Sequence, residues 1–340
     1  FLLFMLASIA QGYAFGRLME RYPRRKRLFL ILSAVLSLGL LGYCKYAGFF
    51  LRTLGALTGL SLPALQIALP IGISFYTFQV LSYVIDVYRG TVPPQRNLLQ
   101  LATYVAMFPQ LIAGPIVRYA DIAPELTCRR HTLADAAAGA RRFVVGLGKK
   151  VLIANVLYEL MSAFLQSTQP SVLFTWLYAV ACALQIYFDF SGYSDMAVGL
   201  GRIFGFHFPE NFRYPFLSGS VTEFWRRWHI SLSTWFRDYV YIPLGGRRCS
   251  KARKDGNLII TFLVSGLWHG AGLTYLVWGG LHGLCQAAEN HLPPRRPGKL
   301  RHALRVAGTF CIRAGAFVIF RASSLANAAE LFKGILCNGG

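Results

Sequence analysis

Long apolar runs alternate along the chain with short, mostly basic segments. Several runs are close to or above the length of about 20 residues that a helix needs to cross a hydrocarbon core. We therefore predict an all-α, polytopic transmembrane chain with roughly eight to ten membrane segments. The runs cover residues 1–19, 28–51, 62–88, 141–165, 172–188 and 306–320, with a shorter helix expected at 196–206.

Some of these runs are interrupted. Pro70 should kink the helix predicted over 62–88, and Pro109 and Pro115 break the run at 98–117. Broken helix at membrane depth persists only inside protein or beside a water-filled cavity. This pattern predicts a broken helix that lies inside protein or lines such a cavity.

Residues 220–240 have a different pattern. Ser220 and Glu223 have the S-x-x-E spacing of a capping box, and the aromatic side that follows carries Trp225, Trp228 and His229. Arginines and serines occupy much of the other side. This pattern predicts one amphipathic helix that lies at the membrane interface.

Residues 258–288 contain no Asp, Glu, Lys or Arg. The stretch is long for one span and short for two spans with a turn. Basic loops on both sides favour a re-entrant hairpin, and one long broken span is the alternative.

Composition agrees with a membrane protein. Of 340 residues, 55% are hydrophobic and 14% charged, against about 25% charged in soluble domains. The mean hydropathy is +0.44. We predict a single membrane-embedded domain over residues 1–340. The chain begins at Phe1 without an initiator Met, as expected of a fragment.

The charge is strongly positive, with 35 Lys and Arg against 14 Asp and Glu. The basic residues lie in short clusters between apolar runs, as in the cytoplasmic loops of membrane proteins. Such clusters attract anionic membrane lipids. We expect no nucleic acid partner, because no charged domain lies outside the apolar runs. Seven scattered cysteines form no C-x-x-C pair and no zinc spacing, so we predict neither a bound metal nor a structural disulfide.

His269 is the leading candidate for chemistry. Counted from Asn257, it lies roughly 18 Å along a helix, near the middle of an uncharged run. A titratable group at that depth is a functional hypothesis by default. The sequence has no G-x-S-x-G, H-E-x-x-H or Walker A motif. This leaves a histidine acting as general base on an incoming hydroxyl, with a packing histidine as the alternative.

Two further groups could contribute. His229 could serve chemistry or simply face lipid headgroups. Asp189, Ser191 and Asp195 follow an apolar run and could line a polar passage, although Asp189 could equally pair with an arginine.

The chain resembles the membrane-bound O-acyltransferase family, closest to its bacterial alginate O-acetyltransferase branch. The resemblance runs in family order from about residue 28 to 325. Members of this family usually carry more at both ends, so the resemblance implies that terminal helices are missing from this chain. Its matching stretches are 69–76, 85–90, 108–115, 187–195, 223–233 and 266–271.

The resemblance implies an inner-membrane enzyme with a tunnel, in which His269 matches the essential buried histidine and His229 a second histidine. It implies acyl transfer from a cytoplasmic thioester, acetyl-CoA or an acyl carrier protein, to a polysaccharide hydroxyl. An extracytoplasmic acetyltransferase- or esterase-like partner is also implied, and no tightly bound cofactor. Trp268, His229 or backbone N–H groups near Gly270 could stabilise the oxyanion, and Trp225 and Trp228 could line the tunnel.

Three readings of the activity stay open. The first is acetylation of an exopolysaccharide such as alginate. The second is peptidoglycan O-acetylation or D-alanyl transfer to teichoic acid. The third belongs to another class: a transporter or channel that catalyses no reaction. The broken helices and the intramembrane acids are also compatible with this interpretation.

Overall fold

The computed structural model describes all residues except 1, 62–64, 66, 169, 293–297 and 337–340. The described residues form helices and connecting segments, with no β-strand among them. They divide into two compact units: residues 1–143 with 197–209, and residues 144–196 with 210–340. The all-α prediction is therefore confirmed, while one domain over residues 1–340 stays a prediction.

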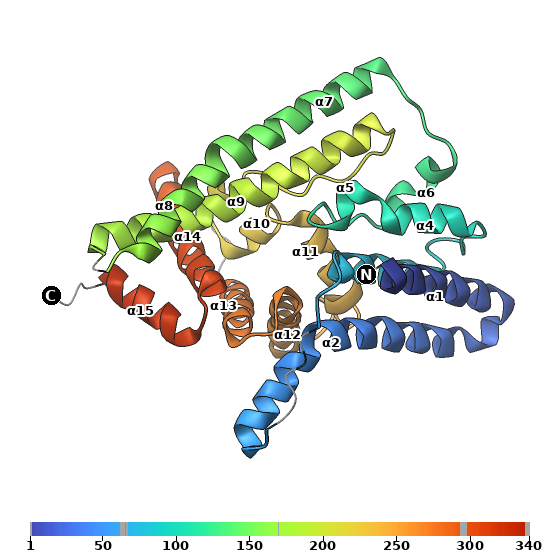
Figure 1. Ribbon diagram of the computed structural model, residues 1–340, viewed down its shortest axis with the longest axis horizontal. Coiled ribbons are helices and arrows are strands. Elements are labelled where there is room, and N and C mark those ends of the chain that lie inside the picture. The colour runs from blue at the N-terminus through green and yellow to red at the C-terminus, as the bar shows by residue number, and fades with distance from the viewer. Residues whose placement is uncertain (1, 62–64, 66, 169, 293–297, 337–340) are drawn as a thin grey trace. The chain divides into compact units, whose positions relative to one another are not determined.

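The first unit begins with a long antiparallel helix pair that packs on a third helix (Figure 1). Small residues of α1 allow this approach: a Cβ at Gly12 would lie 2.8 Å from Val80, and one at Gly16 would lie 2.8 Å from the Tyr83 hydroxyl. The helices of this unit are α1 (Leu2–Arg21), α2 (Lys26–Thr58), α3 (Ile73–Arg89), α4 (Leu98–Ala106), α5 (Phe108–Leu111), α6 (Tyr119–Thr127) and most of α7 (Leu133–Gly148).

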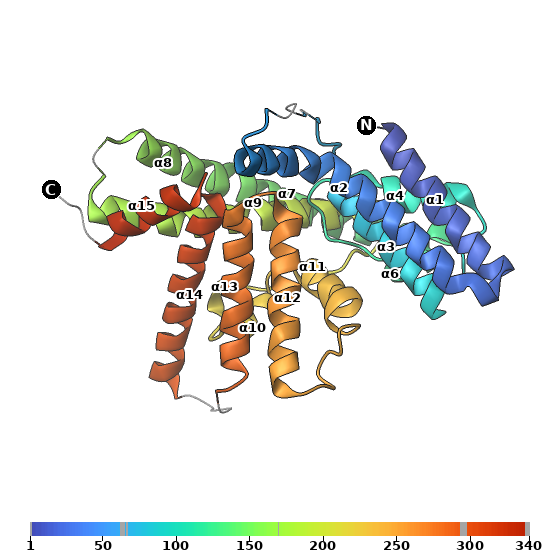
Figure 2. The same ribbon diagram turned by 90° about the horizontal axis from the view of Figure 1, so that it is seen from below.

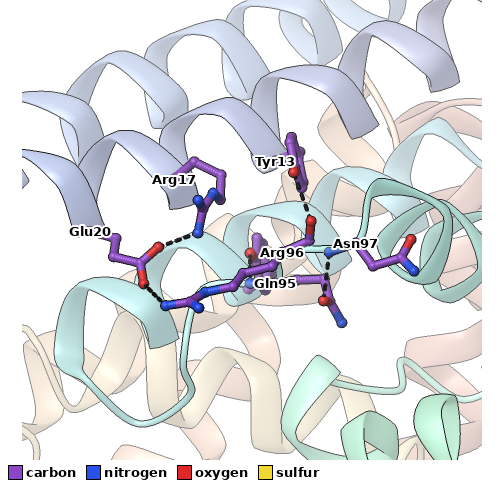
Figure 3. A network of polar contacts seen from close by, with 7 residues as sticks. Tyr13, Arg17, Glu20, Gln95, Arg96 and Asn97 are labelled. Carbon is purple, nitrogen blue, oxygen red and sulfur yellow. Dashed lines mark hydrogen bonds and ion pairs between the residues drawn. The ribbon is translucent and has the colours of Figure 1, made fainter.

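Polar contacts tie the α3–α4 connection to α1 (Figure 3). Glu20 forms an ion pair with Arg17 on the same helix. It forms a second ion pair, at 2.8 Å, with Arg96 of the α3–α4 connection. The Tyr13 hydroxyl donates to the Arg96 carbonyl at 2.9 Å. The pairs are largely exposed, so they orient the connection more than they stabilise the fold.

The second unit contains every candidate site residue. Figure 2 shows α12, α13 and α14 side by side, and α12 with α13 and α13 with α14 are in contact. Its elements are a π-helical segment Lys149–Ala154, α8 (Asn155–Gln166), most of α9 (Val172–Ile203), α10 (Val221–Trp225), α11 (Ile230–Phe236), a π-helical segment Arg237–Tyr241, α12 (Lys251–His269), α13 (Leu273–Glu289), α14 (Lys299–Arg321) and α15 (Leu325–Leu336).

Four helical stretches in the described residues are long and apolar enough to cross a membrane. They are 2–21, 23–58, 172–203 and 299–321. They coincide with runs predicted from sequence, at 1–19, 28–51, 172–188 and 306–320. A membrane protein is therefore supported, and the larger number of segments stays a prediction.

Two element boundaries differ from those predicted. The runs 172–188 and 196–206 are parts of one helix, α9. The helix predicted over 62–88 begins only at Ile73, because Pro70 and the left-handed Gly72 (φ 75°) precede it. Part of that prediction, residues 62–64 and 66, falls outside the described residues. The run at 98–117 is broken as predicted, into α4 and α5.

The prediction of a single amphipathic helix over 220–240 is wrong. These residues form α10, α11 and the start of the π-helical segment Arg237–Tyr241. Residues 226–229 separate α10 from α11, and the last of them, His229, has the left-handed conformation (φ 43°, ψ 55°). Ser220 caps α10 as predicted, accepting the Glu223 N–H at 3.1 Å. The capping box is only half formed, because the Glu223 carboxylate accepts the N–H of Gly219 instead.

Candidate active site

His269 is the last residue of α12, at the turn of a helical hairpin with α13. The described structure thus has two helices in 258–288, broken at Gly270–Gly272. The helices cross closely, because a Cβ at Gly266 would collide with the Tyr275 carbonyl oxygen and one at Gly279 with that of Phe262. Glycines at this crossing therefore bring the end of α12 against α13.

The His269 ring is partly buried among aromatic rings from three helices. Its centroid lies 4.8 Å from Trp268, 5.1 Å from Trp278 on α13 and 5.2 Å from Phe320 on α14, each near perpendicular. The aromatic surroundings restrict the ring's orientation and exclude much of the water. Its remaining exposure leaves a path for a reacting group.

His229 lies in the junction between α10 and α11 and is 2% exposed. Its Nδ1 is 3.2 Å from Oδ1 of Asn211, and its ring meets Phe190 edge to face at 4.7 Å. Burial, and to a lesser degree the neighbouring His269, holds the pKa of His229 well below its usual value of 6.5. His229 is therefore neutral at pH 7.

The tautomer of His229 follows from its partners. Oδ1 of Asn211 also accepts the Ser231 N–H at 3.2 Å, and a backbone N–H can only donate. That oxygen is therefore an acceptor, so Nδ1 of His229 carries the proton. Nε2, which is buried without a hydrogen-bond partner among the described residues, keeps its lone pair.

The acids of α9 are paired with lysines. Asp189 pairs with Lys150 and accepts from Gln185 at 3.2 Å, and Asp195 pairs with Lys149 at 2.6 Å. Both lysines begin the π-helical segment. The pairs join that segment to α9, so the two acids serve first as structural partners. The predicted alternative, that Asp189 forms an ion pair, is therefore observed, but its partner is a lysine and not an arginine.

Ser191 lies between these acids and is 2% exposed, with its hydroxyl unpartnered among the described residues. Trp228 is also buried, stacked on Phe224 at 5.3 Å and packed against Phe317 at 5.1 Å. Both side chains therefore belong to the interior of the second unit.

Trp225 differs, because it also lines a pocket of about 590 Å³. The pocket lies among α10, α11, the segment Arg237–Tyr241, α12 and α13. Its lining includes four cationic side chains and no acidic one: Arg226, Arg237, Arg247 and Lys254. Ser265, at the inner part of its α12 wall, lies one helical turn before His269. The arrangement suits a ligand with a polyanionic part.

Several residues of this region were not predicted from sequence. Asn211 and Trp278 carried no local signal, because their contacts with the two histidines are tertiary. Arg313 did carry one, as an arginine inside the apolar run 306–320. Within the described residues, no group of three or more His, Cys, Asp or Glu side chains could hold a metal ion.

Sequence comparisons identify the family of the chain. The model of the membrane-bound O-acyltransferase family matches residues 94–305. The chain is 46% identical over 320 residues to the probable alginate O-acetylase of Pseudomonas aeruginosa, covering 93% of this chain and 62% of the relative. The chain belongs to the membrane-bound O-acyltransferase family.

Two other relatives show the breadth of the family. A probable alginate O-acetylase of Azotobacter vinelandii is 48% identical, over 87% of this chain and 60% of the relative. A peptidoglycan O-acetyltransferase of Helicobacter pylori is 36% identical, over 92% of this chain and 65% of the relative. The chain thus spans about three fifths of the length of these relatives.

Proposed function

We propose that this chain forms the catalytic part of a membrane-bound O-acyltransferase that transfers an acetyl group from a cytoplasmic thioester towards hydroxyls of a cell-surface polysaccharide such as alginate. The observation that carries the proposal is the partly buried His269 at the hairpin turn, with the neutral, buried His229 close enough to act on it electrostatically. The family and the names of the relatives support the reaction class.

His269 is the general base in this proposal. A thioester is already activated, so no covalent enzyme intermediate is needed. His269 takes the proton of the acceptor hydroxyl as its oxygen attacks the thioester carbon. The tetrahedral intermediate then expels the thiolate, which recovers that proton. General-base catalysis of this kind contributes about 10²–10⁴-fold.

His229 assists as an acceptor. With its proton on Nδ1, its Nε2 can accept a hydrogen bond from a substrate group but cannot donate one to an oxyanion. Oxyanion stabilisation then falls to Trp268 and the backbone N–H groups near Gly270. In this proposal His269 removes a proton, whereas His229 only accepts a hydrogen bond.

The cation-lined pocket is our candidate for the donor. Acetyl-CoA and phosphopantetheine carriers both present phosphates, which arginine and lysine bind well. Four cations and no acid line the pocket, and its α12 wall leads towards His269. The thioester end would then lie nearest the histidine, with the phosphates at the basic loop.

The test is acetyl transfer in proteoliposomes. Purified chain is supplied with radiolabelled acetyl-CoA and a soluble polysaccharide acceptor, for wild type and for His269→Ala. We expect transfer to fall about 10²–10⁴-fold in the variant. His291→Ala is the matched control, since His291 is exposed and pairs with Asp255. Unchanged transfer in His269→Ala would reject the general-base role.

The same assay separates the other readings. Peptidoglycan fragments replace alginate as acceptor, and a D-alanyl carrier protein replaces acetyl-CoA as donor. Adding the extracytoplasmic partner proposed for this branch tests whether it receives the label before the polysaccharide does. Solute flux by wild type, without any acyl transfer, would favour a transporter.

A further inference from the structure

A cationic side chain lies buried in the second unit and has no role in the proposed chemistry. Arg313 of α14 is 0% exposed. Its guanidinium carbon lies 4.1 Å from the ring centroid of Phe224 and 5.7 Å from that of Trp225. Cation–π contacts of this kind compensate part of the lost hydration, but they satisfy no N–H donor.

The hydrogen bonds of Arg313 are few. Its Nη2 donates to the Val221 carbonyl at 3.4 Å, while Nε and Nη1 are buried without a partner among the described residues. Glu289 acts on it electrostatically but forms no ion pair with it there. Both Glu289 oxygens accept backbone N–H groups, from Val221 at 2.6 Å and Thr222 at 2.8 Å.

The neighbouring polar atoms add further donors. Trp225 and Trp278, whose rings are 5.7 Å apart, are 6% and 2% exposed. The indole N–H of each has no acceptor among the described residues. Indole and guanidinium groups can only donate, and arginine does not lose its proton in proteins. The ring of His282, whose buried Nδ1 also has no partner among the described residues, lies 4.7 Å from Trp278 and 5.3 Å from Trp225. An acceptor with negative charge placed among these groups would accept hydrogen bonds from several of them.

We propose that Arg313, with the indole N–H groups of Trp225 and Trp278, binds a small monovalent anion, a halide or a short carboxylate. Trp225 also lines the cation-lined pocket, which gives an anion a route to this cluster. Arg313 and Trp278 are almost fully buried, which favours a small anion over a large polyanion. The site is independent of acyl transfer, so its test can fail without affecting the proposed function.

The first experiment uses the full chain in detergent without substrates. Its melting temperature is measured in chloride, acetate and gluconate at equal ionic strength. We expect a saturable rise of roughly 2–4 °C with the bound anion over gluconate, because a ligand that binds only the folded state raises Tm. A rise with chloride assigns a halide, and one with acetate alone a carboxylate. Equal values in all three anions overturn the proposal.

Variants locate the effect. Arg313→Gln should melt at the same temperature in all three anions, while Arg321→Gln, an exposed arginine on the same helix, should keep the wild-type response. If Arg313→Gln does not fold, Trp278→Phe and Trp225→Phe serve instead. Each removes one donor and should raise the half-saturating anion concentration about tenfold. An unaltered response in both would reject these donors.

Iodide provides a second readout. Bound iodide next to two indoles should quench fluorescence with a saturable phase that chloride displaces, whereas collisions with exposed rings give only a linear phase. The saturable phase should be present in wild type and Arg321→Gln and absent in Arg313→Gln. A purely linear response in wild type would contradict a halide beside Trp225 and Trp278 and leave a short carboxylate, which the acetate melting curve tests.

Discussion

The Nδ1 atom of His229 lies 3.2 Å from Oδ1 of Asn211, the oxygen that also accepts the N–H and hydroxyl of Ser231. Asn211 therefore fixes both the tautomer and the orientation of His229. The left-handed backbone at His229 makes this contact possible, because it turns the chain sharply between α10 and α11. Asn211 thus determines which ring nitrogen of His229 can accept a hydrogen bond.

Replacing Asn211 tests this control. Asn211→Leu removes the acceptor, so His229 loses its orienting bond and acetyl transfer should fall about tenfold in kcat. Asn211→Asp keeps an acceptor at the same place and should retain transfer at neutral pH. Rates of labelled acetyl transfer measure both. Wild-type kcat in Asn211→Leu would contradict an orienting role.

The low pKa of His229 predicts a pH-dependent stability. The unfolded chain takes up a proton at His229 below about pH 6.5, but the folded protein does not. Stability is therefore full above pH 6.5 and falls as the pH drops towards the folded pKa, by up to about 1.4 kcal/mol per pH unit. Chemical unfolding at pH 5, 6, 7 and 8 measures this slope.

Two variants identify the group responsible. His229→Gln should lower the slope between pH 5 and 6.5 by up to about 1.4 kcal/mol per pH unit, since glutamine does not titrate, while other buried groups such as His282 keep their share. His131→Gln removes an exposed histidine that forms no ion pair among the described residues, and it should preserve the slope. A slope that survives in His229→Gln must come from another group.

The helical fold could be predicted because apolar runs of span length need only local sequence. A break within 258–288 could be predicted from the length of this uncharged run, whereas its position at Gly270–Gly272 was not predicted. Continuity of α9 was not predictable. Asp189 and Asp195 suggest a helix end by their charge, and only the tertiary pairs with Lys150 and Lys149 make them tolerable inside one helix.

The site was predictable in part. His269 stood out by its place in an uncharged run. The environment of His229 could not be predicted, because helical periodicity over 220–240 does not reveal that His229 has a left-handed backbone conformation. Asn211 lies 18 residues before His229, in a segment without regular structure. Such contacts form only when distant segments pack, so a single sequence carries no signal for them.

Close packing of α12 on α13 predicts a strong effect at Gly279. An added methyl group would collide with the Phe262 carbonyl oxygen, so Gly279→Ala should lower stability by about 1–3 kcal/mol and shift the hairpin that holds His269. Gly280→Ala is the matched control, because its Cβ would lie 3.6 Å from Leu263, an ordinary contact. Thermal unfolding in detergent and acetyl transfer measure both.

The two variants should differ in their free energy of unfolding. Alanine favours a helix over glycine by up to about 1 kcal/mol, so Gly280→Ala should be neutral or slightly stabilising. Gly279→Ala gains the same propensity but loses more from the collision. Equal stability of the two variants would mean that the helices separate without cost, and the hairpin would not be the rigid support of His269.

The cationic pocket predicts where donor affinity arises. Arg247→Gln and Lys254→Gln should each raise KM for acetyl-CoA about 3–10-fold with kcat unchanged, since they would contact phosphates far from the reacting carbon. Salt should weaken wild-type binding more than that of the variants. Initial rates at several acetyl-CoA concentrations give the constants.

A truncated donor sharpens that test. S-acetyl-N-acetylcysteamine has the thioester but no phosphate, so KM for it should be the same in wild type and both variants. Lys299→Gln, an exposed lysine outside the pocket, should affect neither donor. If Arg247→Gln raised KM equally for both donors, the side chain would be shaping the pocket and not binding phosphate. A fall in kcat with unchanged KM would place it near the chemistry instead.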